Sequence, residues 1–250
     1  MKEIRYELEQ VFNIFPLGDS AITFDLGNSF SIESNLRVRN MQIWLKQDLK
    51  EMVKDVICGY NSVTLIYDSI LVKRKFSSAG TAFEIMRKKL ILAWEGTGDW
   101  NLNQQMELVR VPVCYDKEFG QDLEFVAKTK NLSEPEIIRI HYERIYYIYL
   151  IGFLPGFSYM AEVDDSLIMP RKMNPVMVAP GSVGISGKQT GIYPLQCPGG
   201  WQILGRTPLK LFDQHLSDPV KLRAGQQVQF YPISRDEFDY EWFRENGSAE

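Results

Sequence analysis

The stretch VMVAPGSVGISGKQTGIYPLQCPGGWQIL, residues 176–204, carries most of the information about the fold. It contains short runs of apolar and β-branched residues, and glycine or proline follows each run within two residues. Glycine and proline favour turns that end a strand, so the pattern is typical of short strands joined by tight turns. Their close spacing predicts a closed or nearly closed β-barrel. We expect its strands at 176–178, 183–185, 191–193, 201–204 and 226–233.

The first hundred residues have a different pattern, in which helix and strand signals alternate. Apolar residues within 38–52 recur at intervals of three and four and predict one helix, and those within 83–93 predict a second. Short runs rich in β-branched residues at 21–25 and 62–67 predict strands. We expect a small α/β sandwich in which helices cover one face of a short sheet.

A stretch rich in glycine and asparagine at 95–103 lacks periodicity and has the composition of a linker. We place the domain boundary there, which gives an N-terminal α/β domain at 1–98 and a C-terminal barrel domain at 99–250. The predicted fold class is therefore α+β. Besides the barrel strands, the second domain is expected to contain a strand at 106–113 and helices near 123–127, after the capping-box pair Ser133 and Glu136, and after 234.

The composition is that of an ordinary globular protein and excludes several functional classes. With 28 cations against 32 anions the net charge is −4, whereas nucleic-acid binders usually carry a surplus of lysine and arginine. Three widely spaced cysteines and an N-terminus of mixed charge predict a cytoplasmic protein without a targeting segment. The apolar stretch 145–157 is too short and too broken to span a membrane. Two histidines are too few for an imidazole-based zinc site, so we expect no metal.

One long segment carries charges of a single sign. No aspartate or glutamate occurs from Ser166 to Phe212, although a segment of this length should hold about six at the average frequency of the chain. Its cations favour an anionic ligand, and its many glycines let backbone N–H groups approach that ligand closely. The alternative is a barrel whose strands happen to carry few charges. The cations are Arg171, Lys172, Lys188, Arg206 and Lys210.

Three side chains are candidates for binding a ligand or transferring a proton to it. Arg206 presents a planar fork that can hold a carboxylate through two parallel bonds, and the Gln189 amide can both donate and accept, as a lactam edge requires. A surface role and a turn-capping role are the respective alternatives. His141 shares an apolar helical row with Ile137 and Ile145, so it is either a hydrogen-bonded core residue or a proton-transfer group. The sequence contains neither a P-loop nor a GxSxG nucleophile elbow.

Short motifs rich in glycine, proline and aromatic residues follow one another along most of the chain. They are PLGDSA at 16–21, FGQDL at 119–123, GFLPGFSY at 152–159, PR at 170–171, GSVGI at 181–185, QTGIYP at 189–194, PGGW at 198–201, GRTP at 205–208 and LFD at 211–213. Together they resemble the allophanate hydrolase subunit 1 family. That family includes the B subunits of 5-oxoprolinase and the Kip-type inhibitors of a sporulation kinase.

The resemblance implies a small α/β domain followed by a cyclophilin-like β-barrel. It also implies a protein that is inactive alone and works with two partners, a 5-oxoprolinase A subunit of LamB/YcsF type and a C subunit of allophanate hydrolase subunit 2 type. The implied reaction is ATP-dependent opening of 5-oxoproline to glutamate, with ATP used by the complex. On this resemblance we expect Arg206 or Arg171 to hold the substrate carboxylate, Gln189 to meet the lactam and His141 to move or orient a proton, with Gly181, Ser182 and Tyr193 completing the site.

A second hypothesis remains open, because the family also contains regulators. This chain would then bind a sensor histidine kinase and inhibit it. The first hypothesis predicts activity only when the A and C subunits are added, and the second predicts a kinase complex without turnover. A prolyl isomerase is a third interpretation, although a shared fold does not confer a chemistry.

Overall fold

The computed structural model describes residues 12–27, 31–76, 80–98 and 106–246. The chain divides into two compact units, residues 1–104 and 105–250, and each has a hydrophobic core of its own. Both units combine helices with strands, which confirms the α+β class. The boundary that we expected between 98 and 99 adjoins residues 99–105, which lie outside the described residues.

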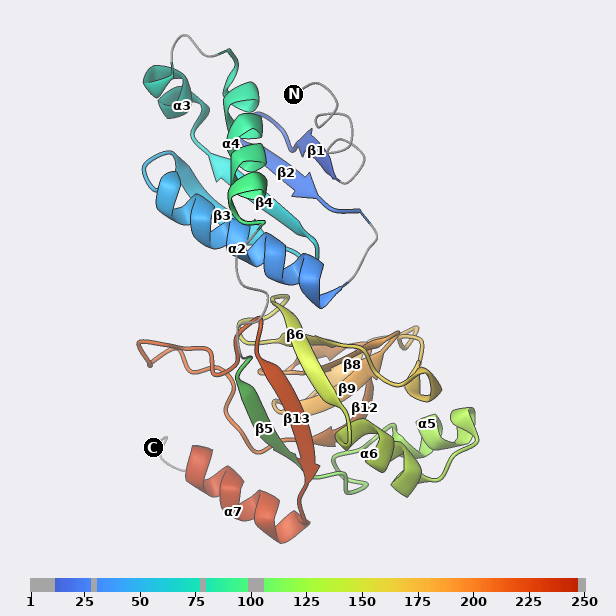
Figure 1. Ribbon diagram of the computed structural model, residues 1–250. Helices are drawn as coiled ribbons and strands as arrows, with labels where there is room; N and C mark the ends of the chain where they lie inside the picture. The colour runs from blue at the N-terminus through green and yellow to red at the C-terminus, as the bar shows by residue number, and fades with distance from the viewer. Residues whose placement is uncertain (1–11, 28–30, 77–79, 99–105, 247–250) are drawn as a thin grey trace. The chain divides into compact units, whose positions relative to one another are not determined.

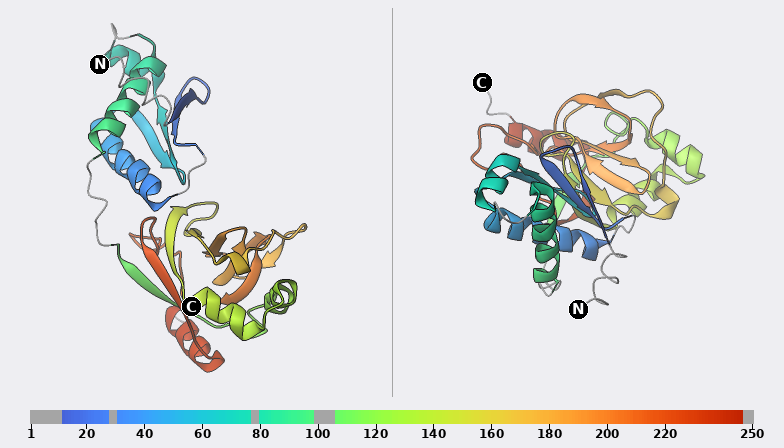
Figure 2. Two further views of the ribbon diagram at one scale, coloured as in Figure 1. Left: turned by 45° about the vertical axis from the view of Figure 1, so that its right-hand side comes forward. Right: turned by 90° about the horizontal axis from the view of Figure 1, so that it is seen from above.

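The first unit is an antiparallel sheet with helices on one face, as Figure 1 and Figure 2 show. Its elements are β1 (Asn13–Pro16), β2 (Ala21–Asp25), α2 (Ile32–Asp48), β3 (Val53–Cys58), β4 (Ser62–Tyr67), α3 (Ser69–Lys75) and α4 (Ala82–Gly96). The strand order is β1-β2-β4-β3. Val63 and Leu65 of β4 are fully buried in one core with residues of α2 and α4, whereas Thr64 between them faces the other way. The expected sandwich is confirmed.

The first unit differs from the sequence pattern at the end of α2, and its elements β1, β3 and α3 were not predicted. The helix α2 ends at Asp48, so Leu49 and Met52 of the predicted helical row lie in the turn that follows, although both remain buried in the same core. The strand β3 was not expected, because Lys54 and Asp55 place adjacent charges inside its short apolar pattern.

The second unit is built on a seven-stranded sheet. Its elements are β5 (Leu108–Val113), α5 (Leu123–Lys130), α6 (Glu134–Tyr142), β6 (Ile145–Ile151), β7 (Ser158–Ala161), the 3₁₀ turn η1 (Asp165–Leu167), β8 (Val176–Val178), β9 (Ser182–Ser186), β10 (Gln189–Ile192), β11 (Cys197–Gly199), β12 (Gln202–Arg206), β13 (Gln227–Pro232) and α7 (Arg235–Asn246). The strand order is β12-β9-β10-β7-β6-β13-β5, and β8 pairs with β11 in a separate small sheet.

The seven-stranded sheet nearly closes on itself. Its neighbouring strands are antiparallel except for β13 and β5, which run parallel. Cys114, directly after β5, exchanges two backbone hydrogen bonds of 2.8 and 2.9 Å with Arg206 at the end of β12. The two outer strands therefore meet, and the expected barrel is confirmed.

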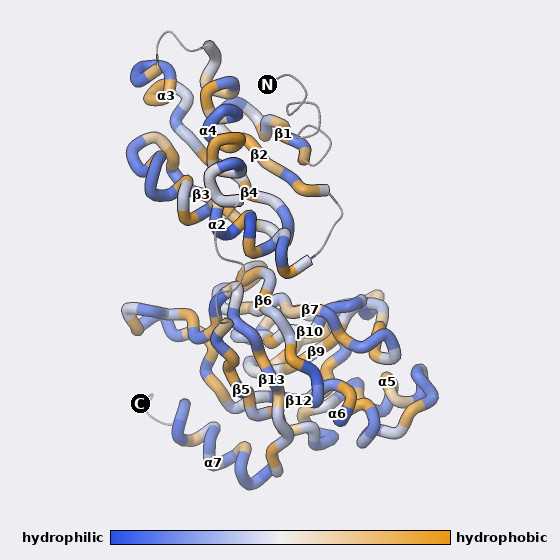
Figure 3. Tube along the Cα trace, in the orientation of Figure 1, coloured by the Kyte–Doolittle hydropathy of each residue, from blue (hydrophilic) through white to orange (hydrophobic). Residues whose placement is uncertain are grey.

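The core of the second unit fills the barrel and extends to the helix pair α5 and α6. The predicted capping box of Ser133 and Glu136 starts α6. The C-terminal helix α7 is mostly hydrophilic (Figure 3) and contacts the unit through a small cluster that includes Phe238 and Trp242. In the described ranges, no helix has both the length and the apolar composition needed to cross a bilayer.

Candidate functional site

An aromatic pocket of about 230 Å³ lies where β7, the β8–β11 sheet and the segments after β10 and β11 meet. Four of the sequence motifs, at 152–159, 170–171, 189–194 and 198–201, contribute to it. The lining residues are Phe153, Phe157, Tyr159, Arg171, Lys172, Pro175, Tyr193, Pro198, Gly199, Gly200 and Trp201.

The aromatic rings of the pocket are arranged edge to face around Phe157. The centroid of the Phe157 ring lies 5.4 Å from that of Trp201, 5.0 Å from that of Tyr193 and 4.7 Å from that of Tyr159. Such contacts place the positive edge of one ring against the negative face of the next, which is a favourable arrangement. Phe157, Tyr193 and Trp201 are buried, whereas Phe153 at the rim is 64% exposed. The pocket therefore has buried aromatic walls and an exposed rim.

Two cations accompany the rings. Arg171 is exposed at the pocket, and among the described residues no carboxylate lies within 4.0 Å of its guanidinium. Lys172, in contrast, is paired with Asp122, with 2.6 Å between Nζ and Oδ2. Burial raises the pKa of Tyr193 to about 12 and raises that of Tyr159, so both hydroxyls are neutral at pH 7. The pocket thus offers one positive charge, from Arg171, beside apolar surfaces.

The segment without acidic residues is largely neutralised in space by carboxylates from outside it. Lys188 Nζ lies 3.9 Å from Glu162, Lys210 Nζ lies 2.8 Å from Asp213, and Lys172 is paired as described. The uniform positive field that we expected from the sequence is therefore reduced to its two arginines.

Gly181 and Ser182 support the pocket from behind and do not line it. The Gly181 amide donates to the Tyr193 carbonyl at 2.7 Å, and the Tyr193 amide donates to the Ser182 carbonyl at 2.9 Å. Gly181 has a φ of +82°, and a Cβ there would collide with the carbonyl oxygen of Thr207. Glycine is required at this position, because other residues rarely adopt that φ. Both residues fix the backbone of Tyr193.

Arg206 lies outside the pocket lining, beneath α7. Its Nε donates to the Pro180 carbonyl at 2.7 Å, and its guanidinium carbon is 4.5 Å from the centroid of the Trp242 ring. The rings of Phe119 and Phe238 lie at 5.7 and 5.8 Å. Burial lowers the pKa of the guanidinium. These cation–π contacts hold α7 against the barrel.

His141 lies inside the barrel with no exposed surface. Its Nδ1 is 2.9 Å from the Tyr115 hydroxyl, and its Nε2 is 3.0 Å from the Thr190 hydroxyl. Because Thr190 donates to the Gly184 carbonyl at 3.1 Å, its oxygen accepts from Nε2–H, and Tyr115 donates to Nδ1. Burial lowers the pKa of His141 to about 3. This geometry fits the core-histidine alternative, and the proton-transfer role stays a prediction.

Gln189 is also distant from the pocket lining. It begins β10, whereas Tyr193 follows the other end of that strand, so a strand's length separates the two. Of the seven predicted site residues, the pocket brings together Arg171 and Tyr193, with Gly181 and Ser182 behind them.

Sequence reasoning missed the aromatic lining as a site. Phe157, Tyr159 and Trp201 all belong to motifs quoted for the family resemblance, but none was named as a site residue. The available signal was the concentration of aromatic residues in two motifs rich in glycine and proline, whose turns bring the rings together.

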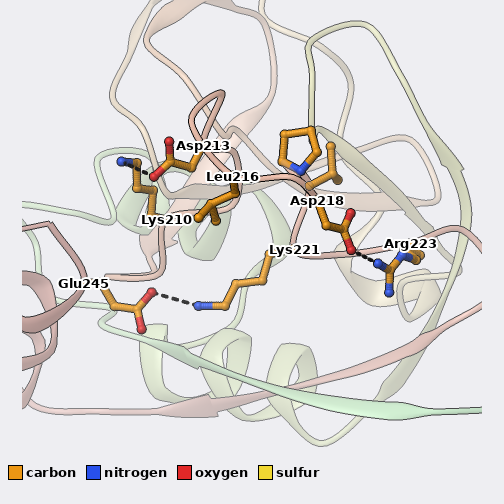
Figure 4. Close-up of a pocket in the computed structure, with 9 residues that line it drawn as sticks. Lys210, Asp213, Leu216, Asp218, Lys221, Arg223 and Glu245 are labelled. Atoms are coloured by element: carbon orange, nitrogen blue, oxygen red, sulfur yellow. Dashed lines mark hydrogen bonds and ion pairs between the residues drawn. The ribbon is translucent and has the colours of Figure 1, made fainter.

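A second cavity, of about 270 Å³, lies beside the loop after β12 (Figure 4). Its charged side chains are mutually paired, so no excess charge remains to select a ligand. The pairs are Lys210 with Asp213 at 2.8 Å, Lys221 with Glu245 at 2.8 Å, and Arg223 with Asp218. Across the part of the chain that the structure describes, no three side chains of the metal-binding types gather as a metal site would require.

Comparison with known proteins gives the family. The family model "Carboxyltransferase domain, subdomain C and D" matches residues 12–222. The chain is 37% identical to the 5-oxoprolinase B subunit of Bacillus subtilis (strain 168) over 98% of this chain and 99% of that protein. It is 36% identical to the 5-oxoprolinase B subunit of Escherichia coli O157:H7 over 86% and 94%. The crystal structure of TTHA0988 is similar at 31% identity and a TM-score of 0.70; the match covers 86% of this chain and 40% of that longer chain.

Proposed function

Because this chain belongs to the allophanate hydrolase subunit 1 family, which includes the B subunits of 5-oxoprolinase, we propose that it is the B subunit of a 5-oxoprolinase. Similarity to proteins of that name along nearly the whole chain supports this proposal. The pairing of one exposed arginine with an aromatic box is the structural observation that carries it.

The pocket suits a small ring that carries a carboxylate. The methylene groups of 5-oxoproline are apolar and pack against the rings of Tyr159 and Trp201. The planar fork of the Arg171 guanidinium donates two parallel hydrogen bonds to the carboxylate. Of the two candidate arginines, Arg171 is favoured because it lines the pocket, whereas Arg206 lies beneath α7. The role of this chain is then to bind and orient the substrate.

The reaction itself belongs to the assembled complex. Ring opening adds one water across the lactam C–N bond and yields glutamate, and hydrolysis of ATP to ADP and phosphate drives it. We propose that partners of the A and C types complete this machinery, with this chain inactive alone.

The test is ATP-dependent release of glutamate from 5-oxoproline by this chain with candidate A and C subunits. Activity should require all three, and Arg171→Gln should raise KM about tenfold, since a charge-assisted bidentate contact is lost. The matched variant Arg206→Gln should keep KM within about twofold of the wild type. Full activity without this chain contradicts the proposal. If folded partners give no activity, the kinase-inhibitor alternative becomes the better hypothesis.

A further inference from the structure

The FGQDL motif contributes nothing to the pocket lining, yet its Asp122 reaches the pocket through an ion pair. Asp122 Oδ2 lies 2.6 Å from Lys172 Nζ, and the two side chains are only 17% and 16% exposed. The same oxygen accepts from the Ile203 amide at 2.7 Å, and the Asp122 amide donates to the Ile203 carbonyl at 3.0 Å. A Cβ on Gly120 would lie 2.5 Å from the Leu204 carbonyl oxygen, so glycine permits this approach to β12. Asp122 is thereby fixed on the barrel.

Three bonds hold the short segment that carries Arg171. On one side, Gln202 Nε2 donates to the Pro170 carbonyl at 3.1 Å. On the other side, the Lys172 amide donates to the Gly200 carbonyl at 2.7 Å. The ion pair is the third bond, and it connects this segment to the start of α5. The backbone around Arg171 is therefore restrained on both sides, while its side chain stays exposed at the pocket.

We propose that Asp122 and Lys172 are a positioning pair that holds Arg171 at the mouth of the aromatic pocket, where it binds the carboxylate of the ligand. The choice of ligand rests on the function proposed above, but the positioning of Arg171 does not. A pair with so little exposure is weakly screened by salt, and removal of either partner leaves the other charge buried and uncompensated. The segment then loses a defined position.

Direct attraction of the ligand by Lys172 is the competing role, and the two roles predict opposite effects of one substitution. If Lys172 binds the anion itself, Asp122→Asn removes a competing negative charge and strengthens binding. If the pair positions Arg171, the same substitution weakens binding, because Lys172 loses its anchor.

Two measurements separate these roles. The first is steady-state glutamate release by the assembled complex as 5-oxoproline is varied. The second is hydrogen exchange at the Lys172 amide in the full chain. The variants are Asp122→Asn, Lys172→Met and the conservative Lys172→Arg. Lys188→Met is the control, because Lys188 belongs to the acid-free stretch 166–212 but does not line the pocket.

We expect KM to rise about fivefold to tenfold in Asp122→Asn and Lys172→Met, with kcat within about twofold of the wild type. Exchange at the Lys172 amide should accelerate in both. Lys172→Arg should recover most of the affinity, because a guanidinium can still pair with Asp122. Lys188→Met should match the wild type in both measurements.

A lower KM in Asp122→Asn overturns the proposal, as does unchanged exchange at the Lys172 amide in both disruptive variants. General unfolding is recognised by lost protection throughout the second unit and by lack of recovery in Lys172→Arg, and it also counts against a positioning role. If exchange accelerates but KM stays constant in these variants and in Arg171→Gln, the positioning is supported and the proposed ligand of the pocket is wrong.

Discussion

The buried histidine makes the stability of the second unit depend on pH, and the structure sets the size of the effect. Burial lowers the pKa of His141 from 6.5 to about 3. Each pKa unit corresponds to about 1.4 kcal/mol, so the effect amounts to about 5 kcal/mol in full. The ring is stacked 4.7 Å from the ring of Phe230, and its Nδ1 accepts from Tyr115, so a second ring proton would place a cation in the core and break that acceptor role.

The sign follows from the two pKa values. The unfolded chain binds the proton more tightly than the folded chain, so the stability is fully present above pH 6.5 and is lost as the pH falls toward 3. Between pH 7 and pH 5, His141 alone should remove about 2 kcal/mol from the free energy of unfolding.

The assay compares the wild type with His141→Gln and His215→Gln, which replaces the other histidine, an exposed one. Urea-dependent hydrogen exchange of peptides from β6 and β10 reports unfolding of the second unit at pH 7 and pH 5. His141→Gln is less stable at both values, because the amide does not fill the space of the ring, but its loss between them should be about 2 kcal/mol smaller. His215→Gln should follow the wild type. An equal loss in His141→Gln would refute a neutral, buried His141.

Three further predictions concern the pocket wall, the thiols and α7. Gly199→Ala places a Cβ 2.7 Å from the Tyr193 hydroxyl and should lower the free energy of urea unfolding by about 1–3 kcal/mol. A Cβ at the neighbouring Gly200 meets nothing closer than 3.7 Å, so Gly200→Ala should lower it by less than about 0.5 kcal/mol. Burial raises the pKa of all three cysteine thiols. A disulfide reagent should therefore label the native chain at pH 7 far more slowly than the urea-unfolded chain, and equal labelling rates would contradict this protection of the thiols. Trp242→Ala uncovers the guanidinium of Arg206, so phenylglyoxal should modify that arginine severalfold faster, as read by mass spectrometry, and an unchanged rate would argue against the cover.

Local signals were sufficient for much of the fold. Four strands of the run at 176–204, namely β8, β9, β10 and β12, and the capping box of Ser133 and Glu136 were predicted, because turn residues and side-chain caps act within a few positions of the chain. The short strand β11 was not predicted. The strand β6 was not predicted, although its sequence IYYIYLI is strongly apolar. A strand buried on both faces has no alternation, so its pattern does not separate it from a buried helix.

The candidate site was harder to predict because it depends on distant contacts. Asp122 neutralises Lys172 from 50 positions away, and nothing local to either residue reveals the pair. The absence of acidic residues in 166–212 was interpreted as a field in space, but carboxylates from other segments fill that space. Arg171 and Tyr193 were predicted and do line the pocket, since the motifs that contain them form its turns.

The parallel pairing of β5 with β13 also bears on biosynthesis. Leu108 and Gln227 are register partners 119 positions apart, and β13 lies between β5 and β6 in the sheet. During translation, β13, which joins β5 to β6, is therefore synthesised after all the other strands of the barrel. Until that strand emerges, β5 and β6 present open edges to neighbouring nascent chains, so we expect newly made protein to depend on protection of these edges during translation.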